Sequence, residues 1–258
     1  NLKNAYIAIE DQRFYKHHGV DIKRTGAAIL SYVIRRGSSS FGGSTITQQL
    51  VKNLTGDDSN TISRKVKEWF YACVLDCCFS KDDILEAYLN IIYTGPNIYG
   101  VKEAALYYFN RDIKDLSLAE CAFLAGINNS PNSYNPFSDT DKSEKISKRT
   151  KTVLSKMKEL GYIFENEYNE AVSQVDNGLK FSKGNLQNNS SVYSYHTDGL
   201  INEIISDFSN QKHISQDFAT NYFYLSGSSI YSTQNSDIQK VVENECKNKK
   251  YVLKSSKN

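Results

Sequence analysis

The chain has 258 residues, 40% of them hydrophobic and 23% charged, so it is long enough for a substantial core and too apolar to be disordered. A net charge of +2 gives no general attraction to nucleic acid, and we expect no nucleic-acid partner. No apolar run is long enough to cross a bilayer, and the five cysteines include no CxxC pair. These values favour a globular protein whose anion binding, if any, is local.

The first predicted helix runs from Leu2 to about Phe14 and ends in a dense polar cluster, residues 10–18. Carboxylates at such a helix end can supply a catalytic base. The alternative is that Glu10 and Asp11 pair on the surface with Arg13 or Lys16. Both interpretations stay open at this point.

Residues 22–36 combine apolar and basic positions at helical spacing. This pattern fits a helix lying on a membrane surface and equally a plain core-facing helix. The Gly- and Ser-rich segment that follows, residues 37–43, predicts a mobile loop over a groove.

A polar helix is predicted directly after this loop, capped by Ser44 or Thr45. Amide donors and one cation share a face of it at i,i+4 spacing: Gln48, Gln49, Lys52 and Asn53. A helix N-terminus with such a face suits a phosphate or diphosphate. An ordinary capped amphipathic helix explains these residues equally well.

The chain then continues helix after helix. A helix beginning at Thr61 or Ser63 carries Arg64, Lys65 and Glu68, which on their own fit a simple ion pair. Ser80 and the three residues after it are predicted to cap a further helix, Ile84 to Tyr93, which places Glu86, Asn90 and Tyr93 on one stripe. Further helices are predicted over residues 101–109, 117–127 and 140–160, which makes the fold mainly α.

After a polar loop at residues 183–191 the pattern changes. We predict a helix over 200–208, a strand pair at 222–225 and 229–233, and a short helix over 237–246.

Four segments resemble, in order, successive motifs of the peptidoglycan glycosyltransferases, glycosyltransferase family 51: residues 10–19, 43–53, 64–68 and 81–90. A fifth, residues 118–126, resembles the closing helix of that family, so the resemblance covers nearly all of residues 1–175. Asn128 departs from the family, which often has proline there, and lies outside the motifs that the chemistry requires.

The resemblance implies a mainly α, lysozyme-like glycosyltransferase domain over residues 1–178, with a smaller membrane-facing lobe from about Val20 to Phe41. Residues 179–258 resemble the small α/β linker module that precedes the transpeptidase in class A bifunctional penicillin-binding proteins. Transpeptidase motifs are not found: two SxxK matches, at Ser155 and Ser209, have no KTG after them.

The activity implied is polymerisation of lipid II into β-1,4-linked glycan strands with inversion. Glu10 would be the base, and Lys52, Arg64 and Lys65 would hold the donor diphosphate, helped by N–H groups at Ser44 and Thr45. Glu68 would be the second carboxylate, acting through a divalent cation (Mg²⁺ or Mn²⁺) or by steering Arg64 and Lys65. No organic cofactor is implied.

The remaining motif residues divide into two sets. The first would orient sugar or phosphate: Gln48, Gln49 and Asn53. The second would support the site from behind: Asp11, Phe14, His17, Glu86, Asn90 and Tyr93.

The partners implied are lipid II, the growing glycan strand, the membrane surface and cell-wall assembly proteins, on the extracytoplasmic face of a bacterial cell membrane. Two alternatives are a lysozyme-like enzyme that cuts glycan and a catalytically silent wall-assembly scaffold. A diphosphate clamp at Lys52, Arg64 and Lys65 argues against a glycan-cutting enzyme, and the presence of both Glu10 and Glu68 argues against a scaffold.

Overall fold

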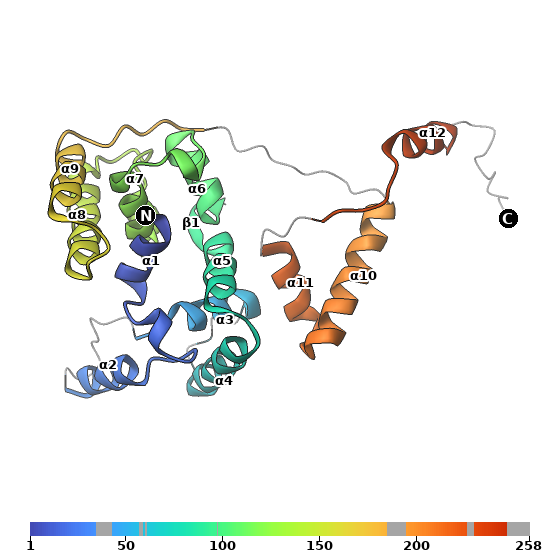
Figure 1. The fold of residues 1–258 in the computed structure, drawn as a ribbon, viewed down its shortest axis with the longest axis horizontal. Coiled ribbons are helices and arrows are strands. Elements are labelled where there is room, and N and C mark those ends of the chain that lie inside the picture. Colours follow the sequence, from blue (N-terminus) through green and yellow to red (C-terminus); the bar gives the residue numbers. More distant parts are fainter. Residues whose placement is uncertain are drawn as a thin grey trace.

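The computed structural model describes residues 1–34, 43–56, 59, 61–96, 98–184, 195–225 and 230–246. Within these ranges the regular structure is almost wholly helical, and Figure 1 shows α1 to α9 gathered in one body with α10 to α12 following to one side. The helices are α1 (Leu2–Glu10), α2 (Ile22–Ile34), α3 (Ile46–Thr55), α4 (Ile62–Cys78), α5 (Lys81–Ile91), α6 (Val101–Phe109), α7 (Leu118–Ile127), α8 (Ser143–Glu159), α9 (Glu165–Asp176), α10 (Tyr195–Lys212), α11 (Gln216–Leu225) and α12 (Ser236–Cys246). The short elements are the 3-10 helices η1 (Phe14–Lys16), η2 (Ile113–Asp115) and η3 (Pro131–Tyr134) and the antiparallel strands β1 (Tyr93–Gly95) and β2 (Ile98–Tyr99).

The core is built around α1, which packs against α7 and α8. Ala5, Tyr6, Ile7 and Ala8 are all buried, and a helix that is buried on every side belongs to the interior. The Tyr6 hydroxyl donates to the Leu124 carbonyl of α7 at 3.0 Å, which satisfies its one polar group. α1 is therefore a buried helix at the centre of the core, and it ends at Glu10.

The helices that surround α1 begin at capping residues. Thr61 caps α4, Ser80 caps α5 and Ser117 caps α7, each by accepting a backbone N–H from the first turn. The helix starts at these three positions are confirmed as predicted, and so is the mainly α fold.

Several boundaries differ from prediction. α5 begins at Lys81 instead of Ile84, α8 begins at Ser143 instead of residue 140, and α10 is longer than the predicted 200–208. The first helix ends at Glu10 instead of Phe14, because Asp11 leaves the helical conformation with φ −154°. Tyr93 lies in β1, beyond the end of α5, so it does not continue the predicted stripe of Glu86 and Asn90. The helix α9 has no counterpart in the prediction.

The predicted strand pair is wrong where the structure describes it. Residues 222–225 form the last turn of α11, and residues 230–233 have no regular structure; residues 226–229 lie outside the described ranges. The Tyr222 ring stacks on Phe208 and Phe79, with centroids 5.1 and 6.1 Å apart. These contacts within and between helices outweigh the β propensity of the aromatic residues.

The chain stays packed on the first body beyond the predicted boundary at residue 178. Ser182 and Gly184 donate backbone hydrogen bonds to the Tyr108 and Tyr107 carbonyls at 2.9 and 3.2 Å. α11 also packs against α3 and α5, and Asn221 Nδ2 donates to the Leu54 carbonyl at 2.6 Å. The division at residue 178 remains a prediction.

The smaller lobe predicted at residues 20–41 is described only as far as Ile34, and the loop predicted at residues 37–43 lies outside the described residues except for Gly43. Ile22 and Ile34, at the two ends of α2, are exposed. Among the described residues, no helix has the length and apolar character needed to span a membrane.

Candidate active site

Glu10 is partly exposed at the end of α1. Gln49 of α3 donates from Nε2 to Glu10 Oε2 at 2.9 Å, and Arg24 of α2 donates to the Glu10 backbone carbonyl. Glu10 is therefore held by α3 at its carboxylate and by α2 at its backbone carbonyl, while solvent still reaches the carboxylate, as a proton acceptor requires.

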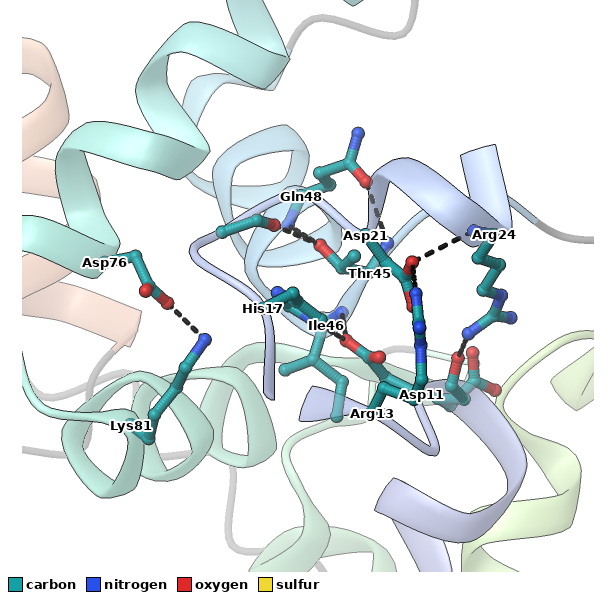
Figure 2. A network of polar contacts seen from close by, with 12 residues as sticks. Asp11, Arg13, His17, Asp21, Arg24, Thr45, Ile46, Gln48, Asp76 and Lys81 are labelled. Carbon is teal, nitrogen blue, oxygen red and sulfur yellow. Dashed lines mark hydrogen bonds and ion pairs between the residues drawn. The ribbon is translucent and has the colours of Figure 1, made fainter. Parts of the chain in front are cut away.

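Asp11, the next residue, is completely buried and joins α1 to α3. Its Oδ2 accepts from His17 Nε2 at 2.9 Å and from the Ile46 backbone N–H at 3.0 Å (Figure 2). Phe14 is also fully buried, and its ring packs edge to face on His17. These three predicted supporting residues lie beneath Glu10, where they hold the turn in place.

A guanidinium–carboxylate pair closes the same turn. Arg13 donates from Nε to Asp21 Oδ2 and from Nη2 to Asp21 Oδ1. The Arg24 backbone N–H also donates to Asp21 Oδ1, at 2.9 Å. Burial opposes ionisation of Asp21, but the bonds from Arg13 and Arg24 outweigh it and lower the pKa of that carboxyl. The surface pairing of Glu10 and Asp11 with Arg13, left open by the sequence, does not occur.

At the N-terminus of α3 the backbone N–H groups of Thr45, Ile46 and Gln48 already have acceptors within the protein. The Thr45 N–H donates to Gln48 Oε1 at 2.9 Å, the Gln48 N–H donates to Thr45 Oγ1 at 3.1 Å, and the Ile46 N–H is taken by Asp11. Thr45 and Gln48 are fully buried and cap the helix, and their predicted contact with substrate stays a prediction.

Glu68 of α4 is 4% exposed and holds two cations. Arg64 donates to Glu68 Oε2 at 2.7 Å and Lys65 pairs with Oε1, while Gln48 Nε2 donates to Oε1 at 3.2 Å. Lys65 Nζ also reaches Ser44 Oγ at 3.0 Å. These contacts fit both the simple ion pair and the steering role considered for Glu68, and the steering role stays a prediction.

The two acids meet on one helix. Gln49 of α3 binds Glu10 and its neighbour Gln48 binds Glu68. Lys52 is exposed and follows Gln49 by three residues and Gln48 by four. It therefore lies one helical turn beyond both glutamines on the same side of α3. The base candidate and the cations are thus joined through a single turn of α3, and Asn53 follows Lys52 with partial exposure.

The stripe predicted on α5 takes a different form. Glu86 is exposed, Asn90 is partly exposed, and Tyr93 lies in β1 with its hydroxyl 3.4 Å from Asn132 Oδ1. The residue of α5 that reaches the site is Tyr88, whose hydroxyl donates to Gln49 Oε1 at 3.2 Å.

Sequence reasoning missed three residues: Arg24, Tyr88 and Asn128. Asn128, at the end of α7, donates from Nδ2 to the Tyr88 hydroxyl at 2.8 Å. The available signal was Tyr88 itself, a hydroxyl on the apolar face of α5, because a buried tyrosine hydroxyl usually has a partner. Cavities of about 460 and 500 Å³ open at α8–α9 and at α4–α11, and neither is lined by these residues.

The helical body and its acid-and-cation site agree with the comparisons to known proteins. A family model described as Transglycosylase matches residues 1–158, and the chain belongs to this transglycosylase family.

Three similar proteins are named penicillin-binding protein 1A or 1A/1B. The chain is 43% identical to penicillin-binding protein 1A of Clostridium botulinum, covering 100% of this chain and 32% of the relative. It is 39% identical to penicillin-binding protein 1A of Clostridium perfringens (94% and 36% covered). It is 41% identical to penicillin-binding protein 1A/1B of Bacillus subtilis (79% and 22% covered). The chain therefore spans about a third of the length of its clostridial relatives.

Proposed function

We propose that this chain polymerises lipid II into β-1,4-linked peptidoglycan strands, with inversion at the anomeric carbon and release of undecaprenyl diphosphate. The observation that carries the proposal is the attachment of Glu10 and of the Glu68 cation group to neighbouring residues of α3. Membership of the transglycosylase family supports it.

Glu10 acts as the base. Its carboxylate takes the proton of the acceptor sugar's 4-hydroxyl as that oxygen bonds to the anomeric carbon of the donor. The bond from the anomeric carbon to the diphosphate oxygen breaks on the opposite face, and its electron pair leaves with the diphosphate. The proton ends on Glu10, which the hydrogen bond from Gln49 holds in position.

Lys52, Arg64 and Lys65 stabilise the negative charge that develops on the departing diphosphate. Glu68 holds Arg64 and Lys65 at a fixed place, so they need little reorganisation during the reaction. Ser44 contributes by holding the Lys65 ammonium.

A protein-held metal at Glu68 does not fit the donor set. Both Glu68 oxygens already accept from cationic groups, and the described residues contain no cluster of three or more His, Cys, Asp or Glu side chains suited to a metal. We therefore derive no step through a metal ion, and the assay below is run both with Mg²⁺ or Mn²⁺ and with a chelator.

The proposal places the reaction at the extracytoplasmic face of a bacterial cell membrane, with lipid II and the growing glycan strand as substrates and cell-wall assembly proteins as partners. The exposed apolar ends of α2, Ile22 and Ile34, support a lobe that faces the membrane surface.

The test is incubation of the protein with labelled lipid II in detergent, followed by separation of the products. Polymer with released lipid diphosphate supports the proposal. Shortened glycan from a preformed strand would indicate a glycan-cutting enzyme, and no turnover at all would indicate a scaffold.

Glu10→Gln should abolish polymer formation and keep the fold, because an amide cannot take the proton. The exposed Glu103→Gln substitution on α6 is the control and should behave as wild type. Polymerisation by Glu10→Gln at near wild-type rate would refute the assignment of the base.

A further inference from the structure

Four polar side chains from four elements form a continuous hydrogen-bonded line that ends at the base. Asn128 Nδ2 donates to the Tyr88 hydroxyl at 2.8 Å, the Tyr88 hydroxyl donates to Gln49 Oε1 at 3.2 Å, and Gln49 Nε2 donates to Glu10 Oε2 at 2.9 Å. We call Asn128, Tyr88, Gln49 and Glu10 the amide–phenol line.

The two ends of the line, Asn128 and the Glu10 carboxylate, favour the same direction for every bond in it. An amide nitrogen can only donate, so the Tyr88 oxygen accepts from Asn128 and its own proton is left for Gln49 Oε1. Once Gln49 Oε1 is engaged by Tyr88, its NH₂ group is the end that faces Glu10. A reversed Gln49 would present an oxygen to the carboxylate and repel it.

Tyr88 is suited to pass this orientation on. Its side chain is fully buried, so the hydroxyl is shielded from solvent. Its ring packs edge to face on Tyr6, which restrains the orientation of the side chain. Burial, and then the nearby Glu10 carboxylate, raise the pKa of Tyr88 well above its ordinary value. The hydroxyl therefore keeps the proton that it gives to Gln49.

We propose that Asn128 is a positioning residue for the glycosyl transfer: through Tyr88 it fixes the Gln49 amide, and the Gln49 amide fixes the carboxylate of the base. The inference rests on the proposed function, since Glu10 needs to be positioned only if it takes a proton. Asn128 itself touches neither substrate nor the reacting atoms.

The decisive variants differ in what they offer Tyr88. Asn128→Asp keeps the shape but offers only acceptors at neutral pH, so the Tyr88 proton turns away from Gln49 and Gln49 Oε1 loses the donor that holds the amide in place. Asn128→Ala removes the donor and leaves Tyr88 free to donate to Gln49. We expect kcat for polymerisation to fall about tenfold or more in Asn128→Asp, and less in Asn128→Ala, with KM for lipid II nearly unchanged in both.

A structural role would give a different ranking, because the alanine variant removes more atoms than the isosteric aspartate. The expected coupling is also specific: in a Tyr88→Phe background, Asn128→Asp should cause no further loss of kcat. Equal or greater loss in Asn128→Ala, or losses that add in the double variant, would overturn the inference.

A second readout is independent of turnover. In protein labelled with ¹⁵N-glutamine, the Gln49 side-chain amide, identified by its loss in Gln49→Glu, should exchange its protons with water faster in Asn128→Asp than in wild type. Equal exchange in both would also overturn the inference. A wild-type protein that makes no polymer would refute the proposed function, while this measurement would still decide whether Asn128 orients Gln49.

Discussion

Gln48 and Gln49 show how much a single step along a helix decides. They are chemically identical neighbours, yet Gln48 is fully buried and bound to Thr45 and Glu68, whereas Gln49 lies between Tyr88 and Glu10. Neighbouring side chains on a helix point about 100° apart, so they meet different surroundings. The sequence predicted both as substrate ligands because residue type carries no information on which side is buried.

Lys52 gives a test at the same scale. Lys52→Ala should weaken use of the donor by the loss of one charge-assisted contact to the diphosphate, on the order of 1.5–3 kcal/mol, which corresponds to a rise in KM for lipid II of roughly ten- to hundredfold. Steady-state polymerisation kinetics measure it. Lys102→Ala, which removes an exposed cation from α6, should leave KM unchanged. An unaltered KM in Lys52→Ala would remove Lys52 from the clamp.

Among the elements, the turn from Asp11 to Asp21 contributes most to the site, because it connects α1, α2, α3 and α4. The sequence predicted helix starts at Thr61, Ser80 and Ser117 because capping depends on local residue types. It did not predict how this turn attaches to α3, because the bonds from Ile46 to Asp11 and from Thr45 to Gly19 join residues that are 35 and 26 positions apart in the chain.

Gly19 is the tightest point of that turn. Its φ is +79°, a side chain there would place Cβ 2.3 Å from the Ala72 carbonyl oxygen, and its own carbonyl accepts from Thr45 Oγ1 at 2.6 Å. Gly19→Ala should therefore lower the free energy of unfolding by more than about 3 kcal/mol in urea titrations.

Gly56→Ala is the matched control for this substitution. Gly56 also has positive φ, at +63°, but a Cβ added there would meet open space. Gly56→Ala should therefore lower the free energy of unfolding by only about 1–2 kcal/mol. Equal losses in the two variants would mean that the approach of the turn to α4 adds nothing.

Asp21 makes the stability of this turn depend on pH. Because its pKa is lower in the folded chain than in the unfolded one, its contribution is fully present above the unfolded pKa of about 3.9 and is lost as the pH falls through the folded pKa. The stability gap between wild type and Asp21→Asn should thus be large at pH 6 and narrow progressively below about pH 4.

Urea midpoints measured between pH 3 and pH 6 check this expectation. Asp198→Asn, an exposed substitution on α10 with the same change of charge, is the control. A gap of constant size across the range would contradict the assignment of the Asp21 ion pair.

On the scale of the whole molecule, the chain after residue 195 contacts the helix that carries the site. α11 packs on α3, and Asn221 donates to the carbonyl of Leu54, two residues after Lys52. The sequence predicted a strand here, because the run Tyr222–Phe223–Tyr224 has high β propensity and the stacking of Tyr222 on Phe79 cannot be read from local pattern.

Asn221→Ala should reduce stability by about 1 kcal/mol and raise hydrogen exchange in the last turn of α3, because Leu54 loses its partner. Hydrogen exchange followed by mass spectrometry, with exposed Asn210→Ala on α10 as the reference variant, measures it. Unchanged hydrogen exchange in α3 would show that the contact between Asn221 and Leu54 does not stabilise α3.

The central place of α1 also has a consequence for the order of events during synthesis. Because α1 precedes α7 and α8 in the chain, it leaves the ribosome before these packing partners, and Tyr6 meets the carbonyl of Leu124 only after 118 further residues have been made. At ordinary translation speeds of about 5–20 residues per second this is a delay of several seconds or more. Although α1 is made before α7 and α8, it is thus among the last of these helices to reach its final packing, and Glu10 at its end is positioned only when the helical body is nearly complete.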